Sequence, residues 1–177
     1  MNAEKTITIL KPNEADAEIL ASLGRETFLQ SHGSSASQKD IDHYVKTFYT
    51  TGLFRQGIAD PKRETRLLLY GGKAIGYSEI ISDTKCTYLD FENAAKFNRL
   101  YILSDYYSLH LGSALFDFNV SLSKEKKQSG MWLYVWKENE RAICFYQKKG
   151  FRIAGSHDFK ISETHSNPNH VMVMNFE

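Results

Sequence analysis

The first half of the chain contains two stretches whose apolar residues alternate with polar ones or form short runs. KTITILK, residues 5–11, alternates and is rich in β-branched residues, so it predicts a first strand. ETRLLLYGGKAIGYSEI, residues 64–80, consists of two apolar runs joined through Gly71 and Gly72. Because paired glycines are typical of a tight turn, this stretch predicts a hairpin.

The second half of the chain contains four more apolar stretches. FNRLYIL, residues 97–103, predicts a strand, and MWLYVW, residues 131–136, is apolar on both faces, which is typical of a buried central strand. FRIAGSHDFKI, residues 151–161, and HVMVMNF, residues 170–176, predict two final strands that pair across a longer loop.

Helical spacing appears twice before the hairpin. Asn13 is placed to cap a helix that runs to about Gln30. Its expected buried face carries Ile19, Leu20, Leu23 and Phe28. After a loop, Ser37 and Asp40 resemble a capping box. The apolar residues of this second helix are Ile41, Tyr44, Val45 and Phe48.

Two more helices alternate with the later strands. One is expected from about Leu111 to Gln128, and the other begins after Asn139, a favourable N-cap, and stops at Gly150. The resulting order is β-α-α-β-β-β-α-β-α-β-β. It predicts an α/β (α+β mixed) fold, with a mixed, mostly antiparallel sheet of six to seven strands and helices on both faces.

Length and charge narrow the class of protein. The 177 residues, 42% of them hydrophobic, fit a single domain over residues 1–177 with a sizeable core. The net charge is +1, which indicates no strongly basic face, so we expect no nucleic-acid partner.

Cysteine usage and the N-terminal stretch bear on location. Cys86 and Cys144 make no disulfide framework, and no metal-ligand spacing surrounds them, so we expect no metal site. MNAEKTITILK lacks the charged-then-apolar pattern of a secretion signal, and no apolar run approaches membrane-spanning length. We therefore expect a soluble cytoplasmic protein that binds no membrane.

Two strand–turn–helix segments carry the candidate chemistry. In DYYSLHLGSAL, residues 105–115, a strand runs into a helix start, whose N–H groups bind anions, and Gly112 lets a pyrophosphate approach the backbone. In the second segment, Asn139 follows a strand, and Tyr146 lies two turns further along an apolar helix face. A tyrosine hydroxyl in that place is suited to protonate a leaving anion.

These two segments resemble the GNAT N-acetyltransferase superfamily. The second, LYVWKENERAICFYQKKGF, fits the family pattern N-x-R-A-x-x-F-Y-x-x-x-G-F at Asn139, Arg141, Ala142, Phe145, Tyr146, Gly150 and Phe151. The resemblance covers essentially the whole chain, including GYSEI in the hairpin and ETF in the first helix. RLYIL and LYVWKENERAICFY look most like the bacterial PaiA-type polyamine acetyltransferases.

The resemblance implies an enzyme that transfers an acetyl group from acetyl-CoA, its cosubstrate, to a primary amine of a small molecule, with polyamines as candidates. Two central parallel strands would splay apart around acetyl-CoA. The backbone of Tyr101, Ile102 and Leu103 would hold the acetyl group and pantetheine. The pyrophosphate would lie on Tyr107, Leu109, His110, Leu111, Gly112 and Ser113. Asn139 would contact the cosubstrate, and Tyr146 would protonate the CoA thiolate as the amine attacks the thioester directly.

The turn departs from the family pattern Q/R-x-x-G-x-G/A. The matching positions are Tyr107, His110 and Gly112, and only the last fits. The missing Gln or Arg removes one polar contact, and His110 adds bulk where backbone should approach the phosphates. Because neither residue is proline, the backbone donors remain, so we expect weakened rather than abolished binding. His110 is also a candidate hydrogen-bond donor to a phosphate.

The catalytic base has no clear pattern. PaiA-type and related sequences often carry a carboxylate on the strand that leads into the turn, whereas KFNRLYIL has none. Glu79, on the neighbouring hairpin strand, is the first candidate, acting directly or through water, and His32 is the second. The plainer interpretations are a solvated strand residue for Glu79 and a loop histidine for His32.

Two classes of function stay open. The first is the enzyme, and the second is a catalytically weak or inactive binding module with a degraded turn. The departures at Tyr107 and His110 favour the binding module, whereas the presence of Tyr146 argues against it. A different acyl donor is a third interpretation. A polyamine pocket should offer carboxylates, and the candidates for its rim are Asp40, Asp42, Asp90 and Glu92. Exposed strand edges near the C-terminus favour a homodimer.

Overall fold

The computed structural model describes residues 6–176 and contains one seven-stranded sheet. Its strands are β1 (Ile7–Leu10), β2 (Arg63–Tyr70), β3 (Lys73–Ile81), β4 (Ala94–Ile102), β5 (Gly130–Trp136), β6 (Arg152–Lys160) and β7 (Ser166–Asn175). Its α-helices are α1 (Ala17–His32), α2 (Gln38–Phe48), α3 (Thr51–Ala59), α4 (Leu111–Glu125) and α5 (Glu140–Lys148). Two short 3-10 segments, η1 (Glu14–Asp16) and η2 (Ser104–Leu109), precede α1 and α4.

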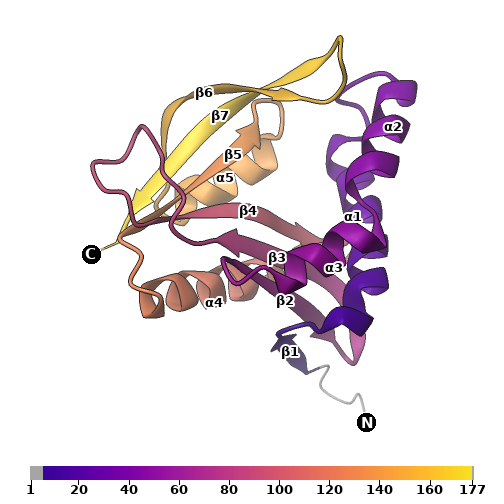
Figure 1. Ribbon diagram of the computed structural model, residues 1–177, viewed down its shortest axis with the longest axis horizontal. Helices are drawn as coiled ribbons and strands as arrows, with labels where there is room; N and C mark the ends of the chain where they lie inside the picture. Colours follow the sequence, from indigo (N-terminus) through magenta and orange to yellow (C-terminus); the bar gives the residue numbers. More distant parts are fainter. Residues whose placement is uncertain (1–5, 177) are drawn as a thin grey trace.

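The sheet is mixed and mostly antiparallel, as the sequence predicts. Its strand order is β1-β2-β3-β4-β5-β7-β6, and every pairing is antiparallel except that of β4 with β5. Helices cover both faces: α1, α2 and α3 gather on one side, and α4 and α5 lie on the other (Figure 1). The buried residues of α1, α2 and α3 belong to one apolar cluster, which Leu111 and Leu115 of α4 join, and the rest of α4 packs with α5 in a second. The sheet is thus the middle layer of three.

The two parallel strands separate soon after they pair. Residues 94–96 of β4 pair with residues 130–132 of β5, and no pairing of the two strands continues beyond that point. Next to this point β4 carries a bulge, because the register with β3 shifts between Glu79 and Ile80. The expected splay of the central parallel strands is therefore confirmed, and it opens the sheet at its centre.

The hairpin turn is also confirmed. Gly71 and Gly72 have φ angles of 58° and 80°, in the left-handed region where glycine has no Cβ to clash. Positive φ at both central residues matches the twist of the flanking strands, so these two glycines fix the register of β2 against β3.

The N-terminal helices differ from the expectation in three places. The sequence analysis missed α3, whose segment TGLFRQGIA contains two helix-weakening glycines and a single capping residue, Thr50. Ile19 and Phe48 are exposed, at 45% and 46%, and not buried as expected. For Ile19 the cause is the position of the buried face of α1, which is centred on Leu20, Gly24 and Phe28, so that Ile19 points away from it. For Phe48 the cause is its place at the last residue of α2.

Three smaller points complete the comparison. α1 extends two residues beyond Gln30, so His32 belongs to the helix rather than to the loop. α4 ends at Glu125 instead of Gln128, with Lys127 in a left-handed conformation (φ 57°) just after it. Lys5, the first residue of the expected β1, lies outside the described residues.

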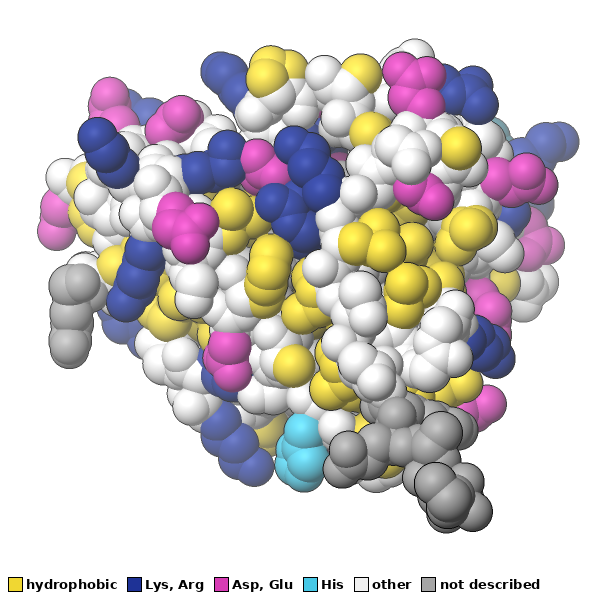
Figure 2. All heavy atoms as spheres, turned by 90° about the horizontal axis from the view of Figure 1, so that it is seen from below, with side chains coloured by type: hydrophobic (Ala, Val, Ile, Leu, Met, Phe, Trp, Pro, Cys, Tyr) yellow, Lys and Arg dark blue, Asp and Glu magenta, His cyan; other side chains and the backbone are white. Residues whose placement is uncertain are grey.

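The outer surface carries mixed charge. On the face drawn in Figure 2, basic and acidic side chains are interspersed with groups of apolar ones. Among the described residues, no helix has both the length and the apolar character needed to cross a bilayer.

Candidate active site

A cleft lies where β4 leaves β5, on the face of the sheet that α4 and α5 cover. Its walls come from the end of α1, the end of β4, the turn before α4, and the first turns of α5. The lining residues are Ser31, Leu100, Tyr101, Ile102, Tyr107, His110, Gly112, Ser113, Asn139, Arg141, Ala142, Phe145 and Tyr146. Most of the residues expected to contact acetyl-CoA are therefore together in one hollow.

The start of α4 has the features of an anion site. His110 adopts a left-handed conformation (φ 56°, ψ 16°), and no side chain caps the helix, so its first N–H groups are not taken by a side-chain oxygen. A Cβ built on Gly112 would meet only Ile102, at 3.7 Å. The fold itself does not need glycine at this position, so the missing side chain leaves space in the cleft for a ligand.

The left-handed turn explains why the family pattern has glycine where this chain has His110. A non-glycine residue with positive φ is strained, although histidine is among the residues that adopt it more often. The His110 side chain is exposed and lines the cleft. The structure thus keeps the backbone turn that the family pattern builds with glycine, and it adds an imidazole at the rim.

Tyr107 makes an unexpected contact across the cleft. The guanidinium carbon of Arg141, from α5, lies 3.5 Å from the centre of the Tyr107 ring. Arginine stacks well on aromatic faces, so the two side chains hold each other in place. Arg141 of α5 therefore places a positive charge beside Tyr107, the position where the family pattern has Gln or Arg.

Asn139 and Tyr146 are positioned by the local structure of α5. The Asn139 side chain accepts a hydrogen bond from the Ala142 N–H at 3.2 Å and so caps the helix. Two turns later, Tyr146 packs among the rings of Phe97, Phe116 and Phe151. Burial raises the pKa of Tyr146 above its ordinary value, so its hydroxyl keeps its proton at neutral pH.

A second pocket, the acceptor-side pocket, lies across the gap in the sheet from the cleft, on the face that α1 and α2 cover. Its walls include the C-terminal part of β4, the end of β5, and the β6–β7 hairpin, whose His165 and Asn167 hydrogen-bond to Ser35 between α1 and α2. Five residues line both this pocket and the cleft: Leu100, Tyr101, Asn139, Ala142 and Tyr146. The two hollows therefore meet at the gap between the splayed strands.

Comparison with known proteins identifies the family. The model of the acetyltransferase (GNAT) domain matches residues 63–153, a stretch that includes β4, the turn, β5 and α5. The chain belongs to the GNAT acetyltransferase family.

The relatives agree with this assignment. The chain is 26% identical over 158 residues to an uncharacterised N-acetyltransferase of Lactobacillus delbrueckii subsp. lactis, covering 89% of this chain and 91% of that protein. It is 24% identical over 152 residues to a spermidine N(1)-acetyltransferase of Thermoplasma acidophilum, covering 84% and 89%. The predicted enzyme class, an acetyltransferase, is therefore confirmed.

A solved structure supports the predicted fold. PaiA N-acetyltransferase from Thermoplasma acidophilum, crystallised with coenzyme A, superimposes with a TM-score of 0.78 at 20% identity, over 97% of this chain and 99% of that one. The likeness shows that this chain has the GNAT fold. A neighbour that holds coenzyme A is consistent with acetyl-CoA as the cosubstrate.

Three of the GNAT residues expected in the cosubstrate site lie outside the cleft lining. Leu103 and Leu111 are buried in the core, and the Leu103 N–H is donated to the Ile75 carbonyl at 2.8 Å. Leu109 is 43% exposed on η2. Their part in holding the cosubstrate stays a prediction. In the structure Leu103 and Leu111 pack in the core, and Leu109 lies on the surface.

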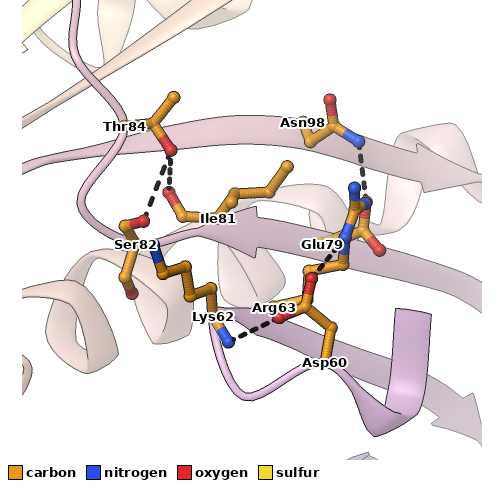
Figure 3. Close-up of polar contacts among 8 residues, drawn as sticks. All are labelled: Asp60, Lys62, Arg63, Glu79, Ile81, Ser82, Thr84 and Asn98. Carbon is orange, nitrogen blue, oxygen red and sulfur yellow. Dashed lines mark hydrogen bonds and ion pairs between the residues drawn. The ribbon is translucent and has the colours of Figure 1, made fainter. Parts of the chain in front are cut away.

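Glu79 lies apart from the two hollows. Its carboxylate accepts hydrogen bonds from Arg63 at 2.9 Å and from Asn98 at 2.7 Å. It faces a third hollow beside α3, which shares Arg99 with the pocket on the α1 side. Figure 3 shows Arg63 between Asp60 and Glu79, with Asn98 reaching the same carboxylate from β4. Both hydrogen bonds hold the Glu79 carboxylate beside α3, away from the junction of the two hollows.

His32, the second candidate base, lines the acceptor-side pocket. Its ring stacks on Phe28 at 5.0 Å and lies 5.8 Å from the Trp136 ring. Its Nδ1 is 2.7 Å from the Ser31 hydroxyl oxygen. Burial lowers the pKa of His32 to about 4, so the imidazole is neutral at physiological pH and is free to accept a proton.

Sequence reasoning missed the polar residues of the acceptor-side pocket. Lys96, Arg99 and Asn169 line it, and none of them belongs to the motif that identified the family. In the sequence, only their positions on predicted strands pointed to these residues, and a strand position does not show that a side chain lines a pocket. The four acidic residues considered for a polyamine rim, Asp40, Asp42, Asp90 and Glu92, do not line it.

Proposed function

We propose that this acetyltransferase moves the acetyl group of acetyl-CoA to the primary amine of a small molecule. The observation that carries the proposal is the meeting of two hollows at the gap between β4 and β5, with Tyr146 lining both. The cosubstrate would enter along α4 and α5, and the amine would arrive from the side of α1. Each reactant would then have its own face of the sheet.

The reaction needs one bond exchange and two proton movements. Acetyl-CoA supplies a thioester, whose C–S bond breaks as the amine nitrogen forms the new C–N bond. The Tyr146 hydroxyl would give its proton to the departing thiolate, since the residue lines the junction and is held protonated by its surroundings. The proton that the amine loses must go to a base on the acceptor side.

We propose His32 as the group that receives this proton, directly or through water. It lines the acceptor-side pocket and is neutral at physiological pH, whereas Glu79 is already paired with Arg63 and Asn98. A pKa of about 4 makes His32 a weak base, so it would pass the proton on to solvent rather than keep it. Glu79, the first candidate from the sequence, then becomes the second, acting through water.

The cosubstrate cradle would use backbone and side chains together. The uncapped start of α4 favours the pyrophosphate, Gly112 leaves it room, and Arg141, held against Tyr107, adds a positive charge beside it. These features support binding of acetyl-CoA despite the departures at positions 107 and 110. They weigh against the alternative of a binding module with a degraded turn.

The relatives suggest a polyamine as one acceptor. One is named a spermidine N(1)-acetyltransferase, and the sequence resembles PaiA-type enzymes. The charges of the acceptor-side pocket also bear on the class of the acceptor.

The test is Tyr146→Phe, with acetyl-CoA binding measured by calorimetry and turnover by thiol release. We expect kcat to fall by about 100-fold or more, because a positioned acid contributes that much, while the acetyl-CoA Kd stays within about twofold. Tyr88→Phe, which removes the hydroxyl of a tyrosine 42% exposed on a surface loop, is the matched control. Unchanged turnover would refute the acid role, and no acetyl-CoA binding by the native protein would favour the binding module.

A further inference from the structure

The acceptor-side pocket has an unusual charge for a site that would hold a polyamine. None of the residues lining it, all within the described part of the chain, is an aspartate or a glutamate. Two of them, Lys96 and Arg99, are cations. A polyamine carries several positive charges, so it would meet repulsion here without a carboxylate to offset it.

Arg99 has no carboxylate partner of its own. Within the described residues, no Asp or Glu oxygen comes within ion-pair distance of its guanidinium. Glu79 faces it across the β3–β4 pairing and acts on it electrostatically, but the hydrogen bonds of Glu79 go to Arg63 and Asn98. The Arg99 charge is therefore only partly balanced.

The aromatic neighbours of Arg99 engage only part of its donors, since the Tyr77 hydroxyl is the one side-chain oxygen that interacts with the guanidinium among those that bear on its charge. The guanidinium carbon lies 5.1 Å from the Tyr49 ring centre and 4.9 Å from that of Phe54. Such contacts use the face of the guanidinium, whereas its N–H groups point outward in the plane. They also stabilise a buried cation by less than its burial costs. A planar anion that accepts two hydrogen bonds from the guanidinium would supply the missing counter-charge.

Lys96 brings a second cation to the same pocket. Its ammonium lies 5.2 Å from the Trp132 ring and 4.8 Å from the Tyr134 ring, and burial lowers its pKa. Within the described residues it has no ion pair. Lys96 and Arg99 are three residues apart on the strand that forms one wall, so both charges act on a ligand in this hollow.

Asn169 adds an unused acceptor to the same pocket. The residue is 6% exposed, and its Oδ1 has no hydrogen-bond partner among the described residues. It lies on β7 opposite Trp136, which also lines the pocket. A buried amide oxygen without a partner is costly, so a ligand N–H would satisfy it.

We propose that the acceptor is a primary amine that also carries a carboxylate, with the carboxylate held by Arg99 and Lys96 and the amine nitrogen directed toward Asn169 and the gap at Tyr146. This inference rests on the proposed function and names its substrate class. Arg99 is then a residue that determines specificity, and polyamines are poor substrates.

The test compares amines that differ only in the group at the far end. The probes are δ-aminovalerate, its neutral amide δ-aminovaleramide, and cadaverine, with spermidine as the polyamine. We expect kcat/KM for δ-aminovalerate to exceed that for cadaverine and spermidine by about tenfold or more, the range of a charge-assisted hydrogen bond, with the amide in between. A preference for cadaverine or spermidine would overturn the inference while leaving the proposed function intact.

Substitutions locate the preference at Arg99. Arg99→Gln should raise KM for δ-aminovalerate by about tenfold or more and change KM for cadaverine little, whereas Arg99→Lys should retain part of the preference. Lys137→Gln removes one exposed charge just after β5, outside the pocket lining, and serves as the control. If Arg99→Gln does not fold, Lys96→Gln provides the second variant, with a smaller loss of the same preference.

The outcomes separate the two levels of the proposal. An Arg99 variant that keeps the full preference for δ-aminovalerate would overturn its assignment. If the native protein binds acetyl-CoA but acetylates none of the four amines, the small-amine function and the substrate class fail together. If it acetylates only cadaverine and spermidine, the small-amine function stands and the proposed substrate class alone is wrong.

Discussion

At the scale of single residues, the missing side chain of Gly112 shapes the cleft as much as the side chains that line it. Gly112 has no structural need to be glycine, since a Cβ there would touch only Ile102 at 3.7 Å. His110, by contrast, holds a backbone conformation that glycine adopts without strain. Position 112 therefore leaves space in the cleft, whereas position 110 sets the left-handed backbone turn that leads into α4.

This distinction predicts the effect of Gly112→Leu. The added side chain extends into the cleft, so the Kd for acetyl-CoA should rise by about tenfold or more, while the free energy of unfolding stays within about 1 kcal/mol because leucine favours helix over glycine. Calorimetric titration and urea unfolding give the two numbers. Gly112→Ala, which adds the Cβ alone, should bind nearly as well as the native protein. Equal binding by the leucine variant would show that the pyrophosphate does not approach this turn.

At the scale of elements, the sequence predicted those whose pattern is local. The Gly71–Gly72 hairpin, the Asn139 cap and the apolar β5 all appear where the sequence analysis expects them. α3 was missed because its stability comes from packing on α1 rather than from its own residues: Phe54 is 5% exposed, and α3 lies against α1 near Gly24.

The contact between α1 and α3 gives a second prediction. A Cβ on Gly24 would approach Tyr49 Cδ1 to 2.6 Å and Phe54 Cζ to 2.9 Å, so Gly24→Ala should destabilise the protein by about 1–3 kcal/mol despite the better helix propensity of alanine. Gly52→Ala in α3 is the matched control, because its Cβ would meet only Thr50 Oγ1 at 4.0 Å. The control should be neutral or stabilising by up to about 1 kcal/mol. Chemical unfolding of both variants measures the difference, and equal effects would contradict the packing argument.

At the scale of the whole molecule, the cleft was predictable and the acceptor pocket was not. The cleft follows from one contiguous stretch, in which each strand leads into its own helix. The pocket combines α1, β4, the β6–β7 hairpin and a bulge at the point where β4 leaves β5. No spacing in the sequence relates Arg99 to Asn169, and the pairing of Glu79 with Arg63 is equally non-local. The sign of the charge in the pocket therefore had to come from the structure.

The half-buried position of His32 has a consequence for the stability of the entire fold. Burial lowers its pKa to about 4, whereas an unfolded histidine titrates near 6.5. Between these values the unfolded state binds the proton and the folded state does not. The free energy of unfolding is therefore undiminished above pH 6.5, falls as the pH drops toward 4, and loses nothing further from this group below 4. The loss is at most about 3 kcal/mol and is smaller where solvent reaches the ring.

His32→Gln tests this linkage. Carboxylates also titrate in acid, and the substitution removes ring stacking, so the relevant quantity is the change in unfolding free energy between pH 7 and pH 4.5, compared between variants. We expect that change to be smaller in His32→Gln than in the native protein by about 1–2 kcal/mol. His43→Gln makes the same substitution at an exposed histidine on α2 and should leave the change as it is in the native protein. If His32→Gln loses as much stability between pH 7 and pH 4.5 as the native protein does, His32 is protonated in the folded state at pH 4.5, and the fold does not lower its pKa to the expected extent.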